Sequence, residues 1–175
     1  GLFSTGFKAG GFTRNVTPGN IAFTYDPQHT YNGEVGIKYR SLDGALEASV
    51  AAYYNVTTDY QMFVGVQPIQ YLQNVGEVTA KGIDLKVRAR PTDRFGITAG
   101  LGFNRTTFTE YENPVTPGID YTGNFVPYAP EVTANLAIDY AFDLADGWGQ
   151  LIPRIGLTYA SPVYFDETNT IGQKG

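Results

Sequence analysis

The residues able to do chemistry in this 175-residue sequence are few, and they form no catalytic pattern. The single histidine, His29, lies between Pro27 and Tyr31, which favours a solvated loop position; a haem or metal ligand would need a partner, and none is near in sequence. Asp139 and Asp143 could act as a general acid and base, but the polar lining of a strand explains them more simply. With no cysteine and no Ser-His-Asp order, we expect no enzyme, no metal site and no cofactor.

Four residues are better suited to binding a small molecule. Arg14, Arg105, Tyr111 and Tyr121 lie in or beside segments rich in turn-forming residues. A guanidinium group among aromatic rings can hold an anionic, aromatic compound through ion pairs and cation–π contacts. We take these four as candidate ligand contacts.

A second set of cations, Lys86, Arg88 and Arg90, alternates along one strand face. Ion pairs with neighbouring strands, or with another part of the protein, explain this basic stripe most simply. The net charge of −5 argues against a nucleic-acid partner, which would need a basic surface.

The stretch 80–104 shows which elements must position these groups. Two runs of apolar residues recur with a period of two, on either side of the turn-forming residues Pro91, Thr92 and Asp93. Successive side chains of a strand point to opposite sides, so the pattern predicts an antiparallel hairpin with one apolar and one polar face. The apolar rows are Ile83, Leu85, Val87 and Ala89, then Phe95, Ile97, Ala99, Leu101 and Phe103.

The same rhythm predicts about seven antiparallel, up-and-down strands and no helix of useful length. We expect them at 2–8, 33–40, 45–63, 71–90, 95–109, 131–143 and 149–160. Asp43-Gly44 and Asp146-Gly147 are hairpin turn signals. Pro153 removes a ladder donor and predicts a bulge or break in the last strand.

Three features indicate that the apolar face touches lipid rather than a soluble core. Connections after the second, fourth and sixth strands are short, whereas those after the first, third and fifth are long, which is the asymmetry of outer-membrane barrels. Aromatic residues bracket the apolar rows: Phe95 and Phe103 lie about 26 Å apart along the strand and about 20 Å after tilt. The opposite face is rich in Gly, Thr, Asn and charges, which a barrel lumen tolerates.

Seven strands cannot close a barrel, because about eight is the minimum with a filled interior. Open strand edges are not tolerated in hydrocarbon, so further strands must complete the wall. We therefore expect residues 1–175 to be one partial transmembrane β-barrel domain, a piece of a longer protein.

Several ordered segments resemble TonB-dependent outer-membrane receptors, and together they cover essentially the whole chain. They are residues 6–12, 25–27, 31–38, 74–76, 81–85, 90–93, 126–130 and 164–166. The resemblance implies the later part of a 22-stranded barrel in the bacterial outer membrane. In that reading the plug domain, the TonB box and the last strands lie outside these residues.

What the resemblance implies about function is energised uptake of a scarce nutrient. A ferric siderophore is the leading ligand, with haem, cobalamin or carbohydrate as alternatives. The implied partners are membrane lipid, the plug and remaining strands, and TonB through the N-terminal region. Two other hypotheses stay open: a passive porin-like channel, and a soluble β-sandwich binding module.

Overall fold

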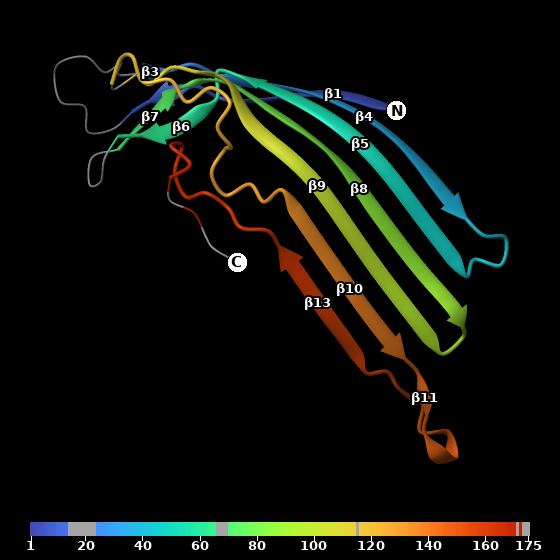
Figure 1. Cartoon of the computed structure of the whole chain (residues 1–175). Coiled ribbons are helices and arrows are strands. Elements are labelled where there is room, and N and C mark those ends of the chain that lie inside the picture. The colour runs from blue at the N-terminus through green and yellow to red at the C-terminus, as the bar shows by residue number, and fades with distance from the viewer. Residues whose placement is uncertain (14–23, 66–69, 115, 171, 173–175) are drawn as a thin grey trace.

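The computed structural model describes residues 1–13, 24–65, 70–114, 116–170 and 172. Seven strands form one antiparallel sheet in which neighbours in the sheet follow one another along the chain, as the up-and-down prediction requires (Figure 1). In sheet order these strands are β1 (Leu2–Lys8), β4 (Gln28–Arg40), β5 (Leu46–Thr58), β8 (Gly76–Thr92), β9 (Phe95–Tyr111), β10 (Val132–Tyr140) and β13 (Arg154–Ala160).

Three short hairpins lie outside this sheet. They pair β2 (Gly11–Phe12) with β3 (Thr24–Tyr25), β6 (Gln61–Val64) with β7 (Tyr71–Asn74), and β11 (Phe142–Asp143) with β12 (Gln150–Leu151). The helical content of the described chain is a single 3₁₀ turn, Ala145–Gly147. Within the described ranges, no helix has the length and hydrophobicity needed to cross a bilayer.

The register gives the sheet two chemically distinct faces. Ile83 lies opposite Phe103, and Leu85 opposite Leu101, so apolar residues of β8 and β9 meet on one side. The same side continues through Leu136 of β10, which pairs with both Ala99 and Leu157. We call this side the apolar face. The other side, which carries Asp84, Asn104 and their neighbours, is the polar face, and the predicted alternation is confirmed.

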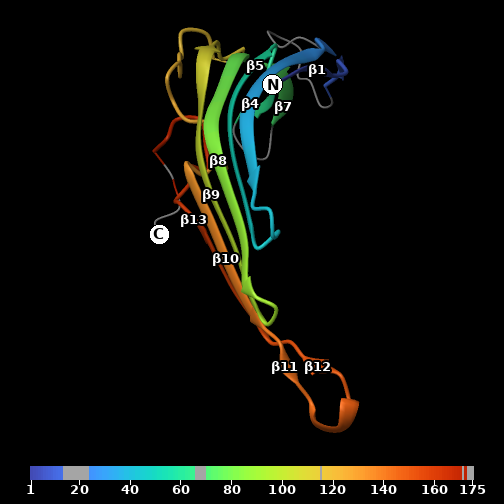
Figure 2. The same ribbon diagram turned by 90° about the vertical axis from the view of Figure 1, so that its right-hand side faces the viewer.

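The two ends of the sheet also differ. Short turns at 41–45 and 93–94 join β4 to β5 and β8 to β9. Between β10 and β13 the chain runs on beyond these turns as the β11–β12 hairpin (Figures 1 and 2). Tyr140 N–H bonds the Pro153 carbonyl at 3.3 Å, but the proline has no N–H to return, so the ladder is interrupted where the sequence predicted a break.

Several predicted boundaries were wrong. The strand predicted at 71–90 is split, because β7 pairs with β6 and only β8 belongs to the main sheet, and β10 ends at Tyr140 rather than Asp143. β4 begins at Gln28 rather than Gly33, because residues 28–32 already pair with β1 up to Lys8. β5 ends at Thr58 rather than continuing to Phe63, because Asp59 has a positive φ of 53° and turns the chain out of the sheet. Residues 61–64 then pair with β7 in a separate hairpin.

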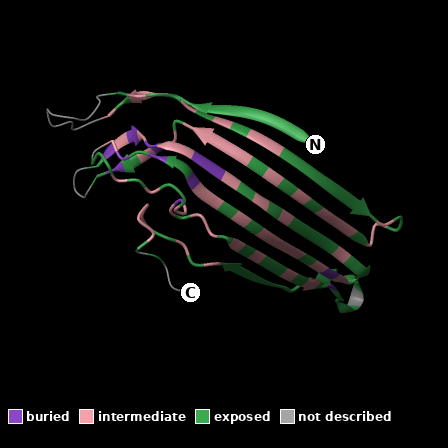
Figure 3. Ribbon diagram, turned by 45° about the horizontal axis from the view of Figure 1, so that its top comes forward, coloured by how far each residue is buried: buried purple, intermediate pink, exposed green. Residues whose placement is uncertain are grey.

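The buried core lies at the end of the sheet with the long connections, not between two layers. Figure 3 shows most of the buried positions gathered there, while elsewhere the inner strands carry intermediate and exposed positions and the edge strands β1 and β13 are exposed throughout. The core residues are Val64, Val75, Val78, Phe108, Tyr111 and Val126, with Tyr60, Met62 and Tyr121 packed against them. The rest of the apolar face has no cover within the described chain, as in the wall of a barrel surrounded by lipid.

Candidate functional site

An aromatic cluster forms where the long connections fold onto the polar face. Val78 lies directly opposite Phe108, and both continue the polar-face rows of β8 and β9. Phe108 contacts Tyr60 and Tyr111 edge to face, with ring centroids 6.3 Å and 5.0 Å apart. Tyr111 also contacts Tyr121, at 5.0 Å. The polar face is therefore roofed at this end by residues of two different connections, which we call the loop core.

Tyr111 is the tyrosine of the loop core with the least exposed surface. Burial raises the pKa of its hydroxyl above the usual value, and the nearby Glu167 raises it further. Its backbone N–H donates to Thr122 Oγ1 at 3.1 Å. Its own hydroxyl is buried and finds no hydrogen-bond partner among the described residues. A buried hydroxyl with no partner is costly.

The structure describes three of the four candidate ligand contacts and separates Arg105 from the two tyrosines. Tyr111 and Tyr121 meet in the loop core, as described above. Arg105 shares the apolar face with Phe103, two residues earlier on β9, and its guanidinium carbon lies 5.2 Å from the centre of the Phe125 ring. Arg14 lies outside the described residues. Sequence alternation could have placed Arg105 on the apolar face, since odd-numbered positions of β9 share that side. The same alternation could have identified Phe108, because it is a bulky apolar residue in a row of otherwise polar positions.

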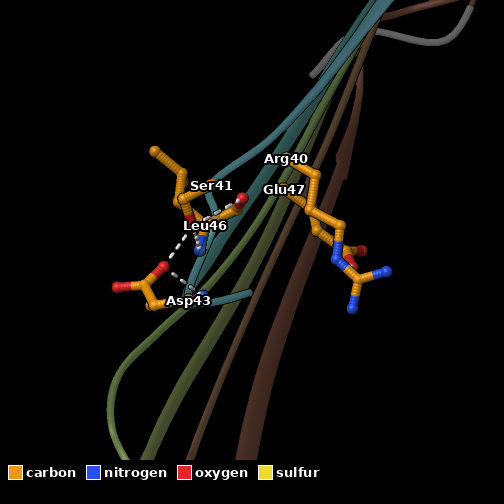
Figure 4. A network of polar contacts seen from close by, with 6 residues as sticks. Arg40, Ser41, Asp43, Leu46 and Glu47 are labelled. Atoms are coloured by element: carbon orange, nitrogen blue, oxygen red, sulfur yellow. Dashed lines mark hydrogen bonds and ion pairs between the residues drawn. The ribbon is translucent and has the colours of Figure 1, made fainter.

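The polar face carries a cationic cluster near the short turns. Lys38, Arg40, Lys86 and Arg88 line a cavity of about 490 Å³ together with polar residues of β5, β9 and β10. Arg40 Nε lies 3.3 Å from Glu47 Oε1, a bridge between neighbouring strands (Figure 4). In the described part of the chain, the other three cations form no ion pair within 4 Å. Sequence reasoning identified Lys86 and Arg88 but did not join them to Lys38 and Arg40.

Glycines on β9 make room for the polar side chains of β10. A Cβ at Gly96 would lie 2.6 Å from Asp139 Oδ2, and one at Gly100 would lie 2.5 Å from Asn135 Nδ2. Asp139 is paired with Arg154 of β13 in the register. The side chains of Asp139 and Asn135 therefore lie over the glycines of β9 on the polar face.

The suspected acid–base pair does not assemble. Asp143 forms an ion pair with Arg94 and accepts a hydrogen bond from Gln150 Nε2 at 2.8 Å. Asp139 lies on β10 opposite Gly96, whereas Asp143 lies on β11 outside the main sheet. His29 is exposed, as predicted, but it lies on β4 opposite Phe7 and Thr58 rather than in a loop. Across the residues that the structure describes, no three His, Cys, Asp or Glu side chains are placed to hold a metal ion.

The turn between β4 and β5 is fixed by its own side chains. Asp43 Oδ1 accepts from Ser41 Oγ at 2.5 Å and from the Ala45 N–H at 3.0 Å. Ser41 Oγ in turn accepts from the Leu46 N–H at 2.9 Å (Figure 4). These bonds, from Ser41 first and Ala45 second, hold the pKa of Asp43 below its usual value. Gly44 completes the turn with a φ of 72°.

An antiparallel sheet with an uncovered apolar face, a polar face and aromatics at both ends is the wall of a transmembrane β-barrel. The family model "TonB dependent receptor-like, beta-barrel" matches residues 1–175. The chain therefore belongs to the TonB-dependent receptor family, whose barrels lie in the outer membrane of Gram-negative bacteria. The predicted fold class and localisation are confirmed.

Relatives and solved structures agree with this family. The pesticin receptor of Yersinia pestis is 29% identical over 168 residues, covering 96% of this chain and 24% of the relative. The crystal structure of the ferric yersiniabactin uptake receptor FyuA from Yersinia pestis superposes with a TM-score of 0.75 at 26% identity, covering 98% of this chain and 24% of that one. The siderophore receptor PiuA from Acinetobacter baumannii gives a TM-score of 0.65 at 27% identity, covering 90% and 22%. The chain thus spans about a quarter of the length of the relatives that it matches.

Proposed function

We propose that this chain is part of a receptor that takes up a ferric siderophore across the outer membrane by a TonB-dependent mechanism. Its family supports receptor function, and the printed names of its relatives include ferric yersiniabactin and siderophore receptors. In this proposal the seven strands are one arc of a larger barrel. The protein transports its ligand and does not transform it chemically.

The loop core is the observation that carries the proposal. Connections from two hairpins fold onto the polar face and pack around Phe108, rather than leaving the mouth of the barrel open. A mouth built in this way offers aromatic surface and the unpaired Tyr111 hydroxyl to a ligand. Of the four candidate contacts, Tyr111 and Tyr121 are the pair we assign to ligand capture, since Arg105 lies on the apolar face.

The cationic cluster of the polar face suits a second role. Lys38, Lys86 and Arg88 line the cavity near the short turns without a carboxylate partner in the described chain. We assign them to ion pairs with a plug domain inside the barrel. Such pairs would be broken and remade when the plug rearranges, and TonB would supply the energy through a region outside these residues.

The proposal is tested by iron uptake with the full-length receptor. Cells that lack their own siderophore receptors would express it and receive radioactive ferric yersiniabactin or ferrioxamine, the compounds named for relatives. We expect accumulation of one ferric complex that stops when an uncoupler collapses the proton gradient. Iron entry that ignores the uncoupler, together with a large open conductance in planar bilayers, would identify a passive channel instead.

A further inference from the structure

Two cations face each other on the apolar side of the sheet. Lys81 of β8 and Arg105 of β9 are direct register partners, and both side chains are exposed. On that face they form the next cross-strand pair after Ile83 and Phe103. Like charges directly opposite each other on neighbouring strands are destabilising. An arrangement of this kind needs a compensating anion.

The described chain does not supply that anion. Its ion pairs within 4 Å are Arg40–Glu47 and Arg94–Asp143, neither of which involves the two cations. The Phe125 ring fixes the Arg105 guanidinium at 5.2 Å without neutralising its charge. Glu77 lies further along the same row of β8, but its carboxylate accepts a hydrogen bond from Thr109 Oγ1 at 2.8 Å and forms no ion pair with either cation.

The height of the pair relative to the membrane points to the missing partner. Phe103 lies one pair below, and Tyr54 of β5 is the register partner of Lys81. Aromatic residues on the outside of a barrel lie at the level of the lipid headgroups. Lys and Arg at that level attract anionic headgroups, and guanidinium groups bind phosphate oxygens in a bidentate manner.

We propose that Lys81 and Arg105 form a binding site for the phosphate of a phosphorylated lipid headgroup on the outer surface of the barrel. The two cations clamp the phosphate from neighbouring strands, and the aliphatic residues below contact the acyl chains. The site faces away from the polar face, so it is separate from the ligand path and does not depend on which nutrient is transported.

The test measures lipid binding to the purified full-length receptor in non-ionic detergent by native mass spectrometry. The probes are lipid A, a diphosphorylated glycolipid, and the same lipid after enzymatic dephosphorylation. We expect the wild type to retain lipid A, and the double variant Lys81→Ala/Arg105→Ala to bind it about thirtyfold more weakly, from two lost headgroup contacts. The swap Lys81→Arg/Arg105→Lys should keep most of the affinity.

A matched control removes two exposed cations from the polar face. Lys8→Ala/Arg154→Ala changes the net charge equally, and we expect it to leave lipid A binding unchanged. Heat-modifiable migration in electrophoresis would show that each variant is folded, and the single variants at 81 and 105 provide a second measurement if the double variant is not. Equal retention of dephosphorylated lipid, equal loss in the control, or binding of inorganic phosphate without lipid A would overturn the proposal.

Discussion

Replacing Phe108 by alanine should open the loop core while leaving the transmembrane sheet intact. The Phe108 side chain is 1% exposed and makes edge-to-face contacts with Tyr60 and Tyr111. Truncating a buried phenylalanine costs about 3–5 kcal/mol, and each aromatic contact accounts for about 0.5–1.5 kcal/mol beyond area burial. A loss of about 4 kcal/mol corresponds to roughly a thousandfold increase in the population of the locally open state.

Hydrogen exchange on the full-length receptor measures this opening directly. Three amides report on the loop core: Tyr60 N–H bonds the Gly76 carbonyl at 2.8 Å, Val75 N–H bonds the Tyr60 carbonyl at 2.9 Å, and Glu112 N–H bonds the Val75 carbonyl at 2.9 Å. We expect the protection of these amides to fall by up to about a thousandfold in Phe108→Ala. Amides in the middle of β8 and β9 should keep their protection, because their ladder does not depend on the loop core.

Phe63 provides the matched control. It belongs to β6, in the connection between β5 and β8 that also carries Tyr60, but its side chain is 61% exposed. Phe63→Ala should leave all three reporting amides protected, because a surface truncation of this kind changes stability by less than about 0.5 kcal/mol. Unchanged protection in Phe108→Ala, or an equal loss in Phe63→Ala, would refute the reasoning that the loop core is a cooperative unit held by Phe108.

Three further predictions concern the sheet and its turn. Leu85→Arg, in the middle of the apolar face, should destabilise the inserted barrel by about 2–4 kcal/mol. Thr133→Arg on the polar face, where the register partners Gly102 and Ala160 are uncharged, should be nearly neutral, and urea titrations of the refolded full-length receptor compare the two variants. Gly82→Ala should reduce the folded yield, because the added Cβ would clash with the Phe103 carbonyl and the Tyr53 hydroxyl. Gly6→Ala adds a Cβ that meets nothing within 4 Å, so this variant should fold normally, and heat-modifiable migration in electrophoresis measures the folded yield of both. The lowered pKa of Asp43 means that its stabilisation of the 41–45 turn is present above the usual carboxyl pKa and is lost as the pH falls through the lowered value. The hydrogen-exchange protection of the Ala45 amide should therefore fall in acid, and Asp43→Asn should remove that pH dependence.

Residue alternation alone determined the sheet and its two faces. The rows around Ile83, Leu85 and Leu101 repeat every second residue, and a strand has that period whatever its neighbours are. Asp43-Gly44 fixed one turn, because an aspartate side chain can bond nearby backbone N–H groups and a glycine accepts a positive φ. Pro153 marked the break in the last strand, because it lacks a donor in any fold.

The tertiary structure decided what local rules could not reach. Phe108 and Tyr121 are distant in sequence from Tyr60, and only the folding of two connections onto the polar face brings them together as the loop core. Asp139 and Asp143 share a sequence pattern, yet Arg94, from another hairpin, binds only the second of them. Contacts of this kind depend on register and on the packing of separate segments, whereas the strand pattern depends only on the geometry of one chain segment.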